Sequence, residues 1–218
     1  MPRTAKAAPP KPTLVLLVRH GQTPTTGAVL PGRARGLHLA DKGREQAAAA
    51  AERIEHFGER VGAVYASPLE RTRETAAPIA KTLGQRTRVD RGLIEADFGE
   101  WTGAELKALR KLPEWKQVQQ FPSGFRFPGG ESFTEMQTRI TGAIDDLRKR
   151  HPGETVVAVS HADPIKAAVA HALGTHLDLF QRIVVSPCSI TAIAYSTGGP
   201  TVLCVNSTGR DLTTLVPS

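Results

Sequence analysis

Residues 14–23 read Leu-Val-Leu-Leu-Val-Arg-His-Gly-Gln-Thr, a short apolar run that ends in a charged Arg-His-Gly triplet. The apolar part has the length and composition of a buried β-strand. In open α/β sheets, ligands bind at the carboxyl ends of the strands. The triplet therefore predicts that Arg19 and His20 lie where chemistry takes place.

A second apolar run also ends in a histidine. Residues 155–159 read Thr-Val-Val-Ala-Val and lead into Ser160 and His161. We expect the two strands to bring His20 and His161 to the same edge of one sheet. The alternative for each is a core histidine with satisfied hydrogen bonds, or a metal ligand; the placement of both after strands favours an anion site.

Strands and helices alternate along the rest of the chain. We predict strands over residues 13–18, 61–66, 87–90 and 155–159, helices over residues 41–57, 132–150 and 163–173, and a hairpin of residues 189–196 and 201–206. A further helix has Ser67 as its cap and Pro68 as its first residue, and Asp41 caps the first helix. The order predicts an α/β fold, a three-layer α/β/α sandwich with a mainly parallel central sheet and a C-terminal antiparallel hairpin.

The length of 218 residues is enough for one well-buried domain. We expect a disordered tail of Pro and Lys over residues 1–12 and a single catalytic domain over 13–218. Within that domain, the Pro- and Gly-punctuated sequence over about 97–130 predicts a variable lid segment.

Charge and hydropathy limit the classes of function. The net charge of +7 would suit a nucleic-acid binder, but the basic residues are scattered and only 5% of residues are aromatic. We therefore expect no nucleic-acid partner. No apolar run approaches the roughly 18 residues that span a bilayer, and the first residues lack the apolar core of a signal peptide. We expect a soluble cytoplasmic protein with no membrane partner.

The two cysteines, Cys188 and Cys204, fall in the region of the predicted hairpin. A register symmetric about Gly198-Gly199 sets Cys204 opposite Ile193, which argues against a disulfide. We expect two buried thiols in a reducing compartment, and no spacing of Cys with His indicates a metal.

Four blocks resemble the histidine phosphatase superfamily, the phosphoglycerate-mutase-like enzymes, in order and spacing. They are Arg19-His20-Gly21, residues 67–76, Glu95 before Asp97-Phe98-Gly99, and Ser160-His161. Residues 128–132, Pro-Gly-Gly-Glu-Ser, also look like the family's segment before its long helix. The resemblance runs from Leu14 to the terminal hairpin and implies the phosphoglycerate-mutase-like fold. Each block alone is weak evidence, but four in order are specific.

The chemistry of these residues agrees with the resemblance. Neutral imidazole is a competent nucleophile, so His20 can accept a phosphoryl group and pass it to water. Arg19, Arg71 and a protonated His161 can stabilise charge on the phosphoryl oxygens. By family position, Glu95 is the acid that protonates the leaving group and then activates water.

Further phosphate contacts are implied around the two histidines. They come from Gly21, Gln22 and Thr23 after the nucleophile, and from the backbone N–H of Ala162, where the family often has glycine. Thr26 stands where family members commonly have an asparagine that touches the phosphate. Either its hydroxyl substitutes, or Gln22 and Thr23 take over.

Several candidates have alternatives. Arg71 is otherwise an exposed helix arginine like Arg73, and Glu95 competes with Asp97 and Glu100 for the role of the acid. Arg33 and Arg35 either reach a second anionic group of the substrate or are solvated. The middle aromatics wall the pocket or form a local hydrophobic cluster: Trp101, Trp115, Phe121, Phe125 and Phe127. Surface or structural roles are favoured for His38, His56, His151, His171 and His176.

These features predict a metal-independent phosphomonoester hydrolase without cofactors that acts on a small phosphorylated metabolite through a phosphohistidine. The alternatives are a phosphoglycerate-type phosphomutase and a phospho-ligand binding module without turnover. A mutase usually has a long insertion that excludes water, and the middle segment is short for that. Family members are often homodimers, which leaves a homodimer as one option for this chain.

Overall fold

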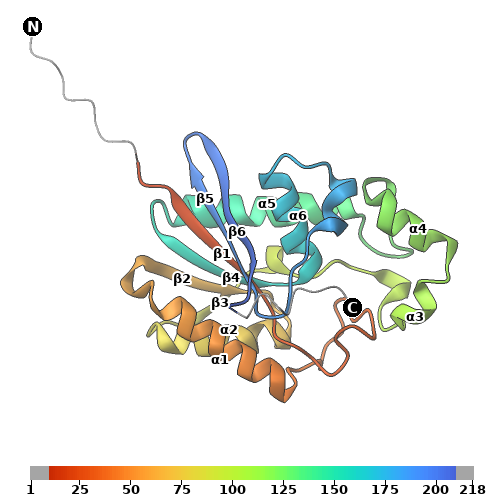
Figure 1. Cartoon of the computed structure of the whole chain (residues 1–218), viewed down its shortest axis with the longest axis horizontal. Helices are drawn as coiled ribbons and strands as arrows, with labels where there is room; N and C mark the ends of the chain where they lie inside the picture. Colours follow the sequence, from red (N-terminus) through yellow and green to blue (C-terminus); the bar gives the residue numbers. More distant parts are fainter. Residues whose placement is uncertain (1–9, 210–218) are drawn as a thin grey trace, which may run out of the picture.

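The computed structural model describes residues 10–209 (Figure 1). The strands are β1 Thr13–Arg19, β2 Val61–Ala66, β3 Thr87–Val89, β4 Thr155–Ser160, β5 Ile190–Ser196 and β6 Gly199–Ser207. The helices are α1 Asp41–Glu55, α2 Glu70–Thr82, α3 Leu106–Leu109, α4 Pro113–Gln120, α5 Phe133–Arg150 and α6 Ala162–Ala172. Of residues 1–12, for which we predict disorder, residues 1–9 lie outside the part of the chain that the structure describes.

The six strands form one sheet in the order β3-β2-β4-β1-β5-β6. β3, β2, β4 and β1 run parallel to one another, and β5 and β6 are antiparallel. The predicted α/β class, the mainly parallel sheet and the terminal hairpin are therefore confirmed.

Alternate side chains of β1 face the two helical layers, which lie on opposite sides of the sheet in Figure 1. Leu16 and Val18 pack in a core with residues of α1 and α2, such as Ile54 and Ile79. Val15 and Leu17 pack in a larger core with residues of α5 and α6. A strand covered on both faces reads as a continuous apolar run, which is why residues 14–18 are uniformly apolar.

Three neighbouring parallel strands end at the same edge of the sheet. Ser67 follows β2, His161 follows β4 and His20 follows β1. β1 and β4 pair in register up to Arg19 and Ser160, and the N–H of His20 donates to the carbonyl of Ser160 at 3.0 Å. The topology thus brings together side chains that are far apart in the sequence.

Two predicted helix caps are wrong. Asp41 is the first residue of α1 and Ala40 is its cap, because the N–H of Ala40 donates to the carbonyl of Gln22 and holds the chain there. α2 begins at Glu70 rather than Pro68, with Leu69 as its cap. The Ser67 hydroxyl lies two residues before that cap and is bonded to His161 at the sheet edge.

The cysteines also depart from expectation. Both are free, but only Cys188 is buried, whereas Cys204 is exposed on the edge strand β6. Cys204 lies opposite Ala192 rather than Ile193. The turn is centred one residue earlier than predicted, since Ser196 pairs with Gly199, and a bulge follows between Ile193 and Ala192.

The segment between β3 and α5 carries the short helices α3 and α4 and several tight turns. Its aromatic side chains pack together: Trp101 contacts Phe125 and Phe127 with ring centroids 5.6 Å apart in each pair, and stacks on Trp115 at 6.4 Å. The local hydrophobic cluster expected there is therefore present, although Phe121 is exposed.

The backbone is closely packed at Gly43, beside the loop that follows His20, but not at Gly142. A Cβ at Gly43 would overlap the carbonyl oxygen of Gln22, whereas a Cβ at Gly142, exposed within α5, meets no atom within 4 Å. We expect Gly43→Ala to destabilise the protein by about 1–3 kcal/mol through overpacking. Gly142→Ala should stabilise it by roughly 0.5–1 kcal/mol, as alanine favours helix. Denaturant unfolding measures the free energy of unfolding of both variants. Equal changes in the two variants would contradict the close approach of Gly43 to the carbonyl of Gln22.

Candidate active site

His20 is buried at the end of β1 with its reactive nitrogen defined by a hydrogen bond. Its Nδ1 lies 2.8 Å from the carbonyl oxygen of Gly21. A carbonyl only accepts hydrogen bonds, so Nδ1 carries the proton and Nε2 keeps its lone pair. Burial, and then the charges of Arg71 and Arg19, hold the pKa of His20 well below its usual value. The side chain is therefore a neutral imidazole with Nε2 as a nucleophile.

His161 lies beside it, with ring centroids 5.2 Å apart. Its Nε2 is 2.8 Å from the hydroxyl of Ser67, whose oxygen also accepts from the N–H of Leu69. When the Ser67 hydroxyl donates to Nε2, Nδ1 carries the proton of the neutral His161 imidazole. Burial, followed by the charges of Arg71 and the proximity of His20, lowers the pKa of His161 well below its ordinary value. The lowered pKa favours the neutral imidazole for His161.

Two arginines converge on the same place. Arg19 donates from Nη1 to the carbonyl of Val185 at 2.6 Å, and the completely buried Arg71 donates from Nη2 to the carbonyl of Gly32 at 2.7 Å. Within residues 10–209, four buried donors there have no hydrogen-bond partner: Nε of Arg19, Nε and Nη1 of Arg71, and Nδ1 of His161. Buried donors without partners are costly, and an anion is the ligand that would satisfy them together.

Glu95 faces the histidines from the loop after β3. Its Oε2 is 3.9 Å from Nδ1 of His161, and its Oε1 accepts from the N–H of Ala96 at 2.9 Å. Burial and the negative charge of Asp163 raise the pKa of Glu95 to about 7, against the opposing effect of Arg71 and Arg19. A carboxyl with this pKa can both give and take a proton near neutrality.

A cleft of about 340 Å³ opens in front of these groups. Arg19, His20 and Glu95 line it, while Arg71 and His161 are fully buried beneath that lining. The outer walls come from the loop after β1, the segment of α3 and α4, and the start of α6. Their side chains include Leu30, Leu106, Arg110, Trp115, Val118, Phe127, Asp163 and Lys166.

The remaining predicted phosphate contacts divide into two groups. Thr23, Thr26 and Ala162 line the cleft, and the Thr26 hydroxyl lies 3.0 Å from that of Thr23 and accepts from the Thr23 N–H. Gly21 and Gln22 are turned elsewhere: their N–H groups donate to the side chains of Thr75 and Gln46. Their contacts hold the loop that follows His20.

Sequence reasoning missed several groups that shape the site. Ser67 orients His161, Thr75 anchors Gly21, and Asp163 acts on the pKa of Glu95. Arg33, whose side chain is 31% exposed, lies outside the cleft lining and bonds Glu95, Asp97 and Glu131. Of these partners, Glu131 has a signal in the sequence, because it belongs to the Pro-Gly-Gly-Glu-Ser segment.

Neutral imidazole among cationic donors, at the carboxyl edge of a parallel sheet, is typical of α/β proteins that bind phosphoryl groups. Residues 15–208 match the profile of the histidine phosphatase superfamily (branch 1). The chain belongs to this superfamily.

Similar proteins carry phosphatase and mutase names. The chain is 33% identical over 171 residues to phosphoserine phosphatase 1 of Hydrogenobacter thermophilus, covering 76% of this chain and 79% of that protein. It is 32% identical over 184 residues to the probable phosphoglycerate mutase GpmB of Cronobacter sakazakii, with 83% and 84% covered. The structure of a phosphoserine phosphatase mutant from Entamoeba histolytica, in complex with phosphoserine, superposes with a TM-score of 0.80 at 26% identity, covering 90% and 98%.

Within residues 10–209, no group of three or more His, Cys, Asp or Glu side chains is arranged to hold a metal ion. No helix of that part combines the length and apolar character needed to cross a membrane.

Proposed function

We propose that the protein is a phosphomonoesterase that works through a phosphohistidine on His20. The observation that carries the proposal is the neutral Nε2 of His20 beside the unpartnered donors of Arg19, Arg71 and His161. A phosphoryl group bound there presents its phosphorus to Nε2 and its oxygens to the donors. Phosphoryl transfer depends mainly on such positioning and charge stabilisation.

In the first step, the lone pair of His20 Nε2 forms a bond to phosphorus as the bond from phosphorus to the ester oxygen breaks. The proton of Glu95 goes to the leaving oxygen, so an alcohol departs and Glu95 becomes a carboxylate. The arginines spread the charge of the transferring group, and no step requires a metal ion.

In the second step, a water molecule attacks the phosphorus of phosphohistidine. Glu95 takes one proton from that water, and the bond between phosphorus and Nε2 breaks. Inorganic phosphate leaves with His20 neutral and Glu95 protonated again, as microscopic reversibility requires.

For the substrate, we propose a small phosphorylated metabolite, with phosphoserine as the first candidate. Support comes from the names of the relatives above and from the mixed charge around the cleft, where Arg110, Lys166 and Asp163 line the wall. Cationic side chains there suit a carboxylate and the aspartate suits an ammonium group. We propose that residues 97–130, which include α3 and α4, form the lid that sets this choice.

Release of inorganic phosphate from phosphoserine, both phosphoglycerates and other phosphomonoesters, with EDTA present, tests the function. We expect release that EDTA does not reduce. Interconversion of the phosphoglycerates without comparable release would identify a mutase. Binding of vanadate without turnover of any ester would identify a binding module and overturn the proposal.

The pKa of Glu95 predicts how the rate depends on pH. Glu95 is protonated, and therefore an acid, below about 7, so kcat/KM should fall as pH rises through that value. Protonation of His20 limits the rate only well below its ordinary pKa. Glu95→Gln should lower kcat/KM for alkyl phosphates about 10²- to 10⁴-fold and remove the alkaline fall.

Glu100→Gln is the matched control, because Glu100 is exposed on the same loop. It should keep the wild-type profile. An alkaline fall that persists in Glu95→Gln and disappears in Glu100→Gln would show that Glu100, and not Glu95, is the acid.

A further inference from the structure

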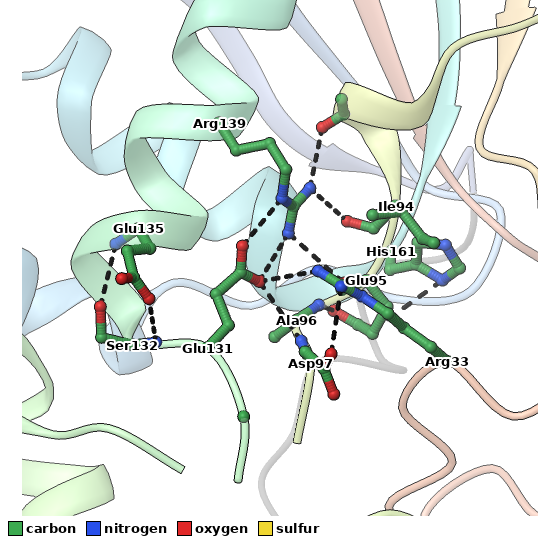
Figure 2. A network of polar contacts seen from close by, with 12 residues as sticks. Arg33, Ile94, Glu95, Ala96, Asp97, Glu131, Ser132, Glu135, Arg139 and His161 are labelled. Atoms are coloured by element: carbon green, nitrogen blue, oxygen red, sulfur yellow. Dashed lines mark hydrogen bonds and ion pairs between the residues drawn. The ribbon is translucent and has the colours of Figure 1, made fainter. Parts of the chain in front are cut away.

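Two arginine side chains hold the backbone of Glu95 (Figure 2). The carbonyl oxygen of Glu95 accepts from Nε of Arg33 at 2.9 Å and from Nη2 of Arg139 at 3.3 Å. Arg139 also donates from Nη1 to the carbonyls of Gly92 at 2.9 Å and Ile94 at 2.7 Å. The chain leading to Glu95 is thus tied at three carbonyl groups.

Glu131 links the two arginines, as Figure 2 shows. Its carboxylate accepts from Nε and Nη2 of Arg139 at 2.9 and 2.8 Å, a two-point contact, and from Nη2 of Arg33 at 3.0 Å. The backbones join as well, since the N–H of Glu131 donates to the carbonyl of Asp97 at 2.8 Å. The Glu131 side chain is only 13% exposed, so solvent screens these charge-assisted bonds weakly.

The donors of these arginines are used within the protein. Nε, Nη1 and Nη2 of Arg139 make five hydrogen bonds, which matches the five N–H groups of a guanidinium. Among the described residues, neither Arg33 nor Arg139 belongs to the lining of the cleft. Their contacts therefore act on the loop that carries Glu95 rather than on a substrate.

We propose that Glu131 is a positioning residue for proton transfer: by orienting Arg33 and Arg139, it fixes the backbone of Glu95 so that its carboxyl faces His20 and His161. The proposal rests on the phosphomonoesterase function proposed above. It assigns a role to the Glu of the Pro-Gly-Gly-Glu-Ser segment, which precedes α5 and, among the described residues, is not part of the cleft lining.

The effect follows from how little else holds the carboxyl of Glu95. The carboxylate of Glu95 accepts a local hydrogen bond from the N–H of Ala96 at 2.9 Å, so its position depends on the backbone. A reacting group displaced by about 1 Å can cost on the order of 10²-fold in rate. Displacement of an acid matters for esters whose leaving oxygen needs a proton, and little for esters whose leaving group departs as a stable anion.

The ratio of kcat/KM for an alkyl phosphate to that for 4-nitrophenyl phosphate tests the role, because kcat/KM contains only steps up to phosphorylation of His20. Glu131→Gln should lower kcat/KM for the alkyl ester about 10-fold or more and that for the nitrophenyl ester less than about 3-fold. Combining Glu131→Gln with Glu95→Gln should give no further loss beyond Glu95→Gln alone.

Glu135→Gln is the matched control, since Glu135 caps α5 and pairs with Arg126 at an exposed position four residues along the chain. It should leave the ratio at the wild-type value. If Glu131→Gln fails to fold, Arg33→Gln removes one of the two donors to the Glu95 carbonyl, and a selective loss on the alkyl ester supports the role in the same way.

Equal losses on both esters, or additive losses in the double variant, would overturn the positioning role and leave the phosphomonoesterase standing. Wild-type protein that hydrolyses neither ester would overturn both the function and the role. A selective loss in Glu95→Gln without one in Glu131→Gln would also overturn the role alone.

Discussion

His20→Ala should abolish phosphate release, lowering kcat by about 10⁴-fold or more, since the nucleophile itself is removed. In the proposed route the imidazole of His20 forms the covalent intermediate, and the carbonyl of Gly21 sets its tautomer. The wild-type protein, quenched in base during turnover, should show the mass of one added phosphoryl group. The variant should show none.

His56→Ala is the control, because His56 is exposed at the end of α1. It should retain wild-type turnover and the phosphoenzyme. Phosphate release by His20→Ala at a rate near that of the wild type would exclude the phosphohistidine route, and a phosphoryl group found on another residue would relocate the nucleophile.

Arg71→Met should lower kcat about 10²- to 10³-fold, the usual cost of losing a donor to developing charge. Two of its guanidinium nitrogens, Nε and Nη1, are buried without a partner in residues 10–209, whereas Nη2 is bonded to the carbonyl of Gly32. The cation also lowers the pKa of His20, so its removal should raise that pKa and move the acidic fall of the pH profile to higher pH. Steady-state rates across pH measure both effects.

Arg73→Met provides the comparison, since Arg73 lies exposed on the same helix two residues away. Loss of the Arg73 guanidinium should change neither kcat nor the acidic fall of the pH profile. A loss confined to stability in Arg71→Met, with kcat and the pH profile intact, would show that the buried arginine serves the fold instead.

Local signals in the sequence were sufficient for most of the elements. The apolar runs before His20 and His161, and the helical periodicity over residues 133–150, reproduce β1, β4 and α5 within a residue or so. Boundaries failed where a distant contact decided them. Ser67 looks like a cap, but its hydroxyl is bonded to His161 across the sheet edge, and α2 starts at Glu70.

The residues of the candidate site also differ in whether local sequence signals predict them. Arg19 ends its strand, and His20 and His161 follow theirs directly, so the order of the chain already placed them at one edge. Arg71 could not be distinguished from an exposed helix residue by local pattern; its complete burial, with Nε and Nη1 unpartnered among residues 10–209, sets it apart. Neither interpretation of Arg33 included its bonds to Glu95 and Glu131, because these partners are close to it only in the folded protein.

The superfamily, the parallel sheet and the two histidines could be predicted from the sequence, because these depend on runs of neighbouring residues and on the order of strands. The protonation of the site and the support of its acid depend on the tertiary structure. Burial and the charge of Asp163 raise the pKa of Glu95, and the arginines that hold its backbone are paired by Glu131. Both effects depend on distances between groups that the chain brings together only when it folds.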